Sequence, residues 1–217
     1  MAKLPTIKPV MIMLYGIPGS GKTHFAVELA QTMGAAHVQG DRIRSELFEK
    51  PAYDKQENEV ITRLMEYMAE EFLKSGVNVI FDMNASRLVQ RRALRDISGR
   101  HKGQTMLVWL QIDPESALMR ISKRDRRRLD DKFARPYTKA EFKLAIGDMQ
   151  PPKNEDYIVV SGKHPFSMQR NAIVKKMYDL GLMSADHVAA NVSKPGLINL
   201  VPSAGRVDMN RRNVTIR

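Results

Sequence analysis

The chain of 217 residues contains no cysteine, which excludes disulfide bonds and thiolate metal sites. Aromatic residues make up only 6% of the sequence, and they do not alternate with basic residues as they would on a base-stacking surface. The longest apolar run, Val10–Tyr15, is far too short to cross a membrane, and the N-terminus lacks the layout of a signal peptide. We therefore predict a cytoplasmic protein that has no membrane partner.

Acidic residues are also in deficit, because 24 Asp and Glu face 35 Lys and Arg and leave a formal net charge of +11. Such an excess favours a polyanionic partner, such as RNA or DNA, or an anionic substrate. The alternative is an ordinary basic enzyme that binds phosphate. The apolar fraction of 43% suffices for one core, and the length fits one domain with a small appendage. No feature indicates an oligomeric state.

Short apolar runs alternate with segments in which apolar residues recur at helical spacing. The predicted strands are 10–15, 37–39, 77–81, 105–112 and 157–160. The predicted helices are 22–33, 41–48, 55–74, 86–98, 114–122, 138–148 and 166–180. This alternation predicts an α/β fold with a doubly wound, mostly parallel sheet of five strands.

The alternation of strands and helices stops after residue 181, which we take as the end of the main domain, 1–181. Residues 182–217 contain an apolar run, Leu197–Val201, then a turn-like segment, 202–205, and a second extended segment. We therefore predict a C-terminal tail that forms a β-hairpin packed on the main domain.

The strongest motif follows the first predicted strand and reads Gly16, Ile17, Pro18, Gly19, Ser20, Gly21, Lys22 and Thr23. Glycines in this pattern let backbone N–H groups converge on phosphate oxygens, and the helix that follows adds its N-terminal N–H groups. Lys22 can reach the β- and γ-phosphates, and the Thr23 hydroxyl can ligate Mg²⁺. The motif predicts ATP and Mg²⁺ as cofactors.

Two carboxylates follow predicted strands, at the sheet edge where the phosphates are expected. Asp41 could accept a proton from an attacking hydroxyl, with Arg44 one helical turn away; alternatively, Asp41 is only a helix N-cap. Asp82 fits a strand-end carboxylate that orients Mg²⁺, and its alternative is a turn residue. Asn84 could position substrate or form the turn.

Two basic segments are candidate anion contacts. Residues 120–143 contain ten Lys or Arg and four acids, and we call residues 120–137 the lid. Arginines that close over a transferring phosphate stabilise its charge, so Arg124 and Arg128 are candidates for that role. Arginines 87, 91 and 95 form one helical ridge, which could contact an anionic substrate or simply be solvated.

These motifs together resemble the P-loop kinase family of small bacterial predicted kinases, in a superfamily with polynucleotide kinase and zeta toxins. The resemblance covers about residues 8–180. It rests on four stretches of the sequence: Gly16–Thr23, Gly40–Arg44, Gly76–Asn84, and the Arg120/Arg124 segment together with Pro152 and Glu155. One departure is that Met83 stands alone between Asp82 and Asn84, where relatives often have a small residue and Thr.

The resemblance implies roles for individual residues. Asp41 would act as the base on the acceptor hydroxyl, and Arg44 would bind the acceptor or its phosphate. Arg124 or Arg128 would contact ATP from the lid, and the loop 150–154 would lie near adenine.

We therefore expect an ATP-dependent phosphotransferase that moves the γ-phosphoryl group to a hydroxyl acceptor. The acceptor stays open between a 5′-hydroxyl of nucleic acid and a small metabolite, because the fold and phosphate loop are shared across substrates. Two alternatives remain, namely a nucleotide-gated RNA-binding ATPase and a zeta toxin-like kinase of nucleotide sugars.

Overall fold

A computed structural model of the chain describes residues 4–125, 127 and 131–183. Its centre is a five-stranded sheet in the order β2-β3-β1-β4-β5, and every pair of neighbouring strands is parallel. The strands are β1 Val10–Tyr15, β2 Ala36–Gln39, β3 Val79–Asn84, β4 Gln104–Gln111 and β5 Ile158–Ser161. The predicted fold class, a doubly wound, mostly parallel sheet of five strands, is confirmed.

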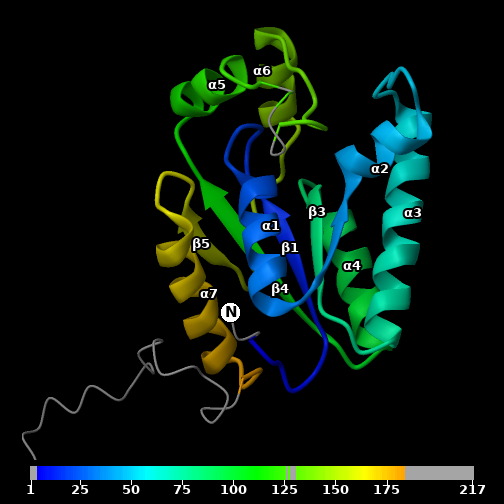
Figure 1. Cartoon of the computed structure of the whole chain (residues 1–217), viewed down its shortest axis with the longest axis vertical. Coiled ribbons are helices and arrows are strands. Elements are labelled where there is room, and N and C mark those ends of the chain that lie inside the picture. The colour runs from blue at the N-terminus through cyan, green and yellow to red at the C-terminus, as the bar shows by residue number, and fades with distance from the viewer. Residues whose placement is uncertain (1–3, 126, 128–130, 184–217) are drawn as a thin grey trace, which may run out of the picture.

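Helices cover both faces of the sheet and the edge where the strands end (Figure 1). They are α1 Lys22–Met33, α2 Gly40–Leu47, α3 Lys55–Lys74, α4 Leu88–Arg100, α5 Pro114–Ser122, α6 Lys139–Gly147 and α7 Phe166–Asp179. Helices α1 and α7 pack on one face, and α3 and α4 on the other. Helices α5 and α6 lie beyond the carboxyl ends of the strands.

Strand β1 lies in the middle of the sheet and is buried on both faces. Val10, Ile12 and Leu14 point into the core that α1 and α7 complete. Met11 and Met13, which alternate with them, point into the core shared with α3 and α4. Burial of each such side chain contributes about 1.5–3 kcal/mol, so the loop that follows β1 starts from the most firmly held strand.

Two boundaries differ from the sequence-based expectation in ways that matter for the site. Strand β3 continues to Asn84, so Asp82 lies within the strand and not after it. Leu182 and Met183, the start of the predicted tail, are buried in the core, and the Leu182 carbonyl accepts from the Ile7 N–H at 3.0 Å. The predicted β-hairpin otherwise lies outside the described residues.

The arginine ridge of α4 anchors the loop before β5. Arg91 is fully buried and donates to Glu155 from Nε at 3.0 Å and Nη2 at 2.7 Å, and to the Ala85 carbonyl at 2.8 Å. Arg95 pairs with the same carboxylate at 2.7 Å. Arg91 therefore neither faces solvent nor is free to contact an anionic substrate, because its guanidinium group pairs with Glu155 inside the protein.

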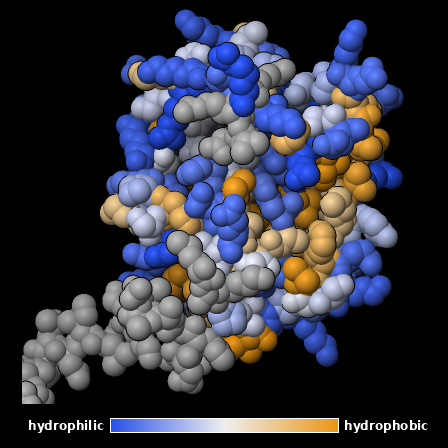
Figure 2. All heavy atoms as spheres, in the orientation of Figure 1, coloured by the Kyte–Doolittle hydropathy of each residue, from blue (hydrophilic) through white to orange (hydrophobic). Residues whose placement is uncertain are grey.

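The surface of the molecule is uneven in polarity. Figure 2 shows hydrophilic side chains over the lid end and an apolar strip along α2 and α3. Leu47, Val60 and Phe72 are exposed apolar side chains of these two helices. Among the described residues, no helix is long and apolar enough to cross a membrane.

Candidate active site

The phosphate loop, Gly16–Thr23, joins β1 to α1 and is enclosed by backbone on two sides. Gly19 has φ 80°, and a Cβ atom there would lie 2.5 Å from the Ala117 carbonyl oxygen of α5. Gly162, in the turn after β5, approaches equally closely, since its Cβ would lie 2.6 Å from the Ser20 carbonyl oxygen. Only glycine fits at Gly19, so the sequence pattern is required by packing as well as by phosphate binding.

Lys22 folds back over this loop. Its ammonium group donates to the Gly16 carbonyl at 2.7 Å and to the Ile17 carbonyl at 3.1 Å. Burial and the nearby Arg124 lower the pKa of Lys22 to about 8, although the charges of Asp82 and Asp41 act in the opposite direction. The ammonium group is thus held within the phosphate loop by two of the loop's own carbonyl groups.

Thr23 and Asp82 meet at the start of α1. The Thr23 hydroxyl donates to Asp82 Oδ1 at 3.4 Å, while Asp82 Oδ2 contacts His37 Nε2 at 3.0 Å. A hydroxyl and a carboxylate are oxygen ligands of the kind that Mg²⁺ prefers. The residues therefore fit the predicted Mg²⁺ site, with one carboxylate oxygen beside Thr23 and the other held by His37.

Asn84 fixes the opposite end of the phosphate loop. Its side-chain oxygen accepts from the Gly16 N–H at 3.3 Å. Two residues earlier on the same strand, Asp82 contacts Thr23 at the other end of the loop, although the pairing of β3 with β1 is irregular here. Strand β3 therefore contacts both ends of the loop, and the Asn84 side chain holds the backbone of Gly16.

Asp41 lies in the first turn of α2, beside the phosphate loop. The helix begins at Gly40 with Gln39 as its N-cap, so Asp41 is not the N-cap residue. Burial raises the pKa of the Asp41 carboxyl, and the negative charge of Asp82 raises it further. A carboxylate with a raised pKa binds a proton more strongly, which suits a general base.

Three arginines act on Asp41 in the opposite sense. The charges of Arg44 and Arg124 lower the pKa of Asp41, as does a hydrogen bond from the backbone N–H of Arg135. The same Arg124 and Asp41 also influence Lys22. The structure thus brings Lys22, Asp41 and Asp82 and the lid residue Arg124 into one electrostatic cluster.

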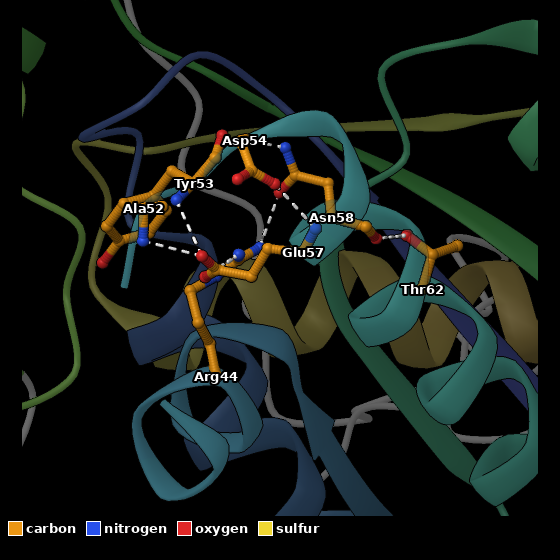
Figure 3. A network of polar contacts seen from close by, with 7 residues as sticks. All are labelled: Arg44, Ala52, Tyr53, Asp54, Glu57, Asn58 and Thr62. Carbon is orange, nitrogen blue, oxygen red and sulfur yellow. Dashed lines mark hydrogen bonds and ion pairs between the residues drawn. The ribbon is translucent and has the colours of Figure 1, made fainter. Parts of the chain in front are cut away.

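Arg44 is buried, and its guanidinium group is used within the protein (Figure 3). Nη1 pairs with the buried carboxylate of Glu57, and Nη2 donates to Asn58 Oδ1 at 2.7 Å. The structure therefore places Arg44 between α2 and α3. Its two Nη groups hold the two helices together and are not directed at an open acceptor site.

The lid contributes its cations from both of its ends. Arg124 donates to the Arg135 carbonyl at 3.0 Å and lies 3.8 Å from the Asp131 carboxylate. Arg120 lies beside the phosphate loop, because its Nη1 would be 3.7 Å from a Cβ atom at Gly21. Arg128 lies outside the described residues.

Sequence reasoning did not single out His37 or Arg135, which contact the two carboxylates. Neither residue belongs to a motif, and Arg135 is one of ten cations in residues 120–143. The loop 150–154 packs against α4, since the Gln150 N–H donates to the Ser86 carbonyl at 2.8 Å. The turn at Gly162 adjoins the phosphate loop.

Comparison with known proteins shows that this chain is similar to proteins that are named as kinases. A probable adenylyl-sulfate kinase from Pyrococcus abyssi (strain GE5 / Orsay) is 27% identical over 177 residues, which are 79% of this chain and 97% of that protein. The Mycobacterium tuberculosis APS kinase CysC, solved in complex with AMPPNP and APS, superposes with a TM-score of 0.59 at 15% identity. That match covers 79% of this chain and 98% of the other.

A chain of the Pnkp1/Rnl/Hen1 RNA repair complex also superposes, with a TM-score of 0.55 and 22% identity over 65% of this chain and 44% of that chain. These solved structures share the P-loop kinase fold. Residues 11–148, more than half of the sequence, match the AAA_33 family, described as an AAA domain. The match includes the phosphate loop, Asp41, Asp82 and the lid. The chain belongs to the AAA_33 family and has the nucleotide-binding fold of P-loop kinases.

Proposed function

We propose that this protein is an ATP-dependent phosphotransferase that moves the γ-phosphoryl group to a hydroxyl acceptor. The observation that carries the proposal is that Asp41 shares one buried electrostatic cluster with Lys22 of the phosphate loop and with Asp82. The raised pKa of Asp41 suits a group that takes a proton from a nucleophile beside the phosphate loop. A kinase needs such a residue to take the proton of its acceptor.

The residues divide into donor and acceptor groups. The loop Gly16–Thr23 and Lys22 hold the triphosphate. Thr23 and Asp82 hold Mg²⁺, which supplies positive charge to the phosphates when it is bound. Asp41 accepts the proton of the attacking hydroxyl, whose oxygen bonds to the γ-phosphorus as the bond to the leaving ADP oxygen breaks.

The lid supplies positive charge to the transferring group. Arg124, which lies within electrostatic reach of Lys22 and Asp41, is well placed for this, and Arg120 adjoins the loop at Gly21. We propose the same role for Arg128 from its position in the basic segment. Arg44 supports Asp41 by holding α2 against α3, and its pairing with Glu57 favours this indirect role over direct binding of the acceptor.

Two acceptor classes remain. One is a small anionic metabolite of the kind that the Pyrococcus abyssi relative is named for, adenylyl sulfate. The other is a 5′-hydroxyl end of nucleic acid, which the net charge of +11 favours. Both are anionic, as the arginines around Asp41 favour.

The test is to incubate the protein with labelled ATP, Mg²⁺ and a panel of candidate acceptors. The panel contains adenylyl sulfate, 5′-hydroxyl oligonucleotides, nucleosides, sugars and aminoglycosides. Label transferred to one member, and lost in Asp41→Asn, names the acceptor. Release of inorganic phosphate alone, unaffected by Asp41→Asn, would reject the kinase assignment and favour a nucleotide-gated ATPase.

A further inference from the structure

Tyr53, in the turn between α2 and α3, has a backbone conformation that is uncommon for a bulky residue. Its φ is 56°, in the left-handed region that non-glycine residues rarely occupy. Glu57 fixes this conformation, since its Oε2 accepts from the N–H groups of Ala52 at 2.7 Å and of Tyr53 at 3.0 Å. Asn58 donates to the Tyr53 carbonyl at 3.1 Å (Figure 3).

The same carboxylate orients Arg44. Glu57 Oε1 pairs with Arg44 Nη1, so one buried side chain holds both the Tyr53 backbone and the arginine. Burial alone would raise the pKa of Glu57, but the hydrogen bonds from Arg44, Ala52 and Tyr53 outweigh burial and keep that pKa below its usual value. The carboxylate is therefore ionised at neutral pH and the arrangement is fixed before any ligand binds.

The Tyr53 ring contacts one arginine of α2 and one arginine of the lid. The Arg44 guanidinium carbon lies over its ring at 4.8 Å from the centroid, and that of Arg135 lies over it at 4.5 Å. Arg135 in turn lies over the ring of Tyr137 at 4.9 Å. All three distances are within the range of attractive cation–π contacts. Two like charges share one ring, which is tolerable because Glu57 neutralises Arg44.

Arg135 is held at its backbone as well. Its N–H donates to the Asp41 carboxylate, and its carbonyl accepts from Arg124 Nη1 at 3.0 Å. The Arg135 side chain contacts the Tyr53 ring, and the Arg135 N–H contacts the Asp41 carboxylate. These two contacts hold one lid residue against α2 and the turn that follows it. A lid held in this way sits directly over Asp41.

We propose that Tyr53 is a positioning residue that fixes Arg135, and through it the lid, over Asp41. The proposal rests on the proposed function only in taking Asp41 as the acceptor base. Without the ring, Arg135 loses the side-chain contact that joins it to the α2–α3 turn, although its contacts with Tyr137 and Glu141 stay. The lid then opens more often, so water competes with the acceptor for the γ-phosphoryl group. Transfer then falls relative to hydrolysis of ATP.

The direct test is hydrogen exchange of the lid, measured by mass spectrometry with AMPPNP and Mg²⁺ present. In Tyr53→Leu we expect peptides spanning residues 131–139 to exchange about tenfold faster than in the wild type. Tyr53→Phe keeps the ring and should exchange like the wild type. The matched control is Tyr67→Leu on α3, an exposed tyrosine that should change nothing. Wild-type exchange in Tyr53→Leu would overturn the proposal.

Arg135→Leu tests the same contact from the lid side, in case Tyr53→Leu does not fold. It should loosen the lid as Tyr53→Leu does, and the double variant should loosen it no further. Additive effects of the two changes would also overturn the proposal. Because exchange needs no acceptor, this result stands apart from the acceptor panel. Once the acceptor is known, Tyr53→Leu should raise hydrolysis relative to transfer and Tyr53→Phe should restore the ratio.

Discussion

The proposed donor side and the proposed acceptor side of the site are built in different ways. The donor side is a continuous stretch, Gly16–Thr23, shaped by glycine backbone and mounted on the central strand β1. The acceptor side combines Asp41, Tyr53 and Arg135, which come from α2, the turn after it and the end of the lid. One side depends on local backbone, and the other on distant side chains that meet only after folding.

This difference predicts how the two sides respond to change. A backbone site tolerates few substitutions but needs no partner from far along the chain. A side-chain site can lose one member while nucleotide binding continues. If the two sides are separate, an acceptor-side variant should impair phosphoryl transfer and leave the affinity for ATP almost unchanged.

The largest effect is expected on the donor side. Lys22→Ala should lower kcat/KM for ATP about 10³-fold, because the charge that faces the terminal phosphates is gone. Lys22→Arg, which keeps a charge, should retain more activity. Steady-state kinetics with varied ATP measures this. An equal loss in both variants would mean that geometry, not charge, limits the donor side.

Asp41→Asn is the matching change on the acceptor side. We expect kcat to fall about 10²-fold because the general base is removed. The Kd for a fluorescent ATP analogue should stay within about twofold, because the charge of Asp41 affects the pKa of Lys22 less than burial or the charge of Asp82 does. Single-turnover transfer and fluorescence titration measure the two quantities. A large loss of ATP affinity would show that the two sides are not separable.

A change in the buried Arg91–Glu155 pair, which belongs to neither side, should lower the stability of the whole fold. Glu155→Gln removes the charge that the buried Arg91 requires, and we expect the free energy of unfolding to fall by about 3 kcal/mol. Glu71→Gln, in an exposed pair with Lys74, is the control and should cost less than about 1 kcal/mol. Urea denaturation measures both. Similar losses in the two variants would contradict the anchoring role of Arg91.

The smallest effect is in the pH dependence of ATP binding. The pKa of Lys22 is about 8, so its ammonium group is protonated at pH 7 and loses its charge as the pH rises through 8. Affinity for ATP should therefore fall about tenfold between pH 7 and pH 9. Lys22→Arg stays charged and should show a flat profile over this range. A flat profile in the wild type would contradict the lowered pKa.

Much of the fold was predictable, and for a clear reason. Buried parallel strands are uniformly apolar and helices keep their own spacing, so the alternation was visible without any long-range information. The phosphate loop was predictable because its residues are contiguous. Asp41 and Asp82 were identified as candidates because functional groups gather where parallel strands end.

The rest of the site depends on contacts between distant parts of the chain. Arg44 had a predicted role at the acceptor, but its partner Glu57 lies on the next helix and was unremarkable in the sequence. The contact of Tyr53 with Arg135 joins the α2–α3 turn to the lid. Arg91 belongs to a ridge that could be identified, yet its burial follows from Glu155 in a loop far along the chain. No local pattern encodes such pairings.

The strand order has a consequence for how such a protein can evolve. Among the residues that the structure describes, strand β1, which carries the phosphate loop, has a neighbour on each side, whereas β2, which leads into Asp41, is an edge strand with β3 as its single neighbour. Mutations near β2 therefore disturb fewer contacts than mutations near β1. A lineage can exchange one acceptor for another at the edge of the sheet while the machinery for ATP at its centre is inherited unchanged.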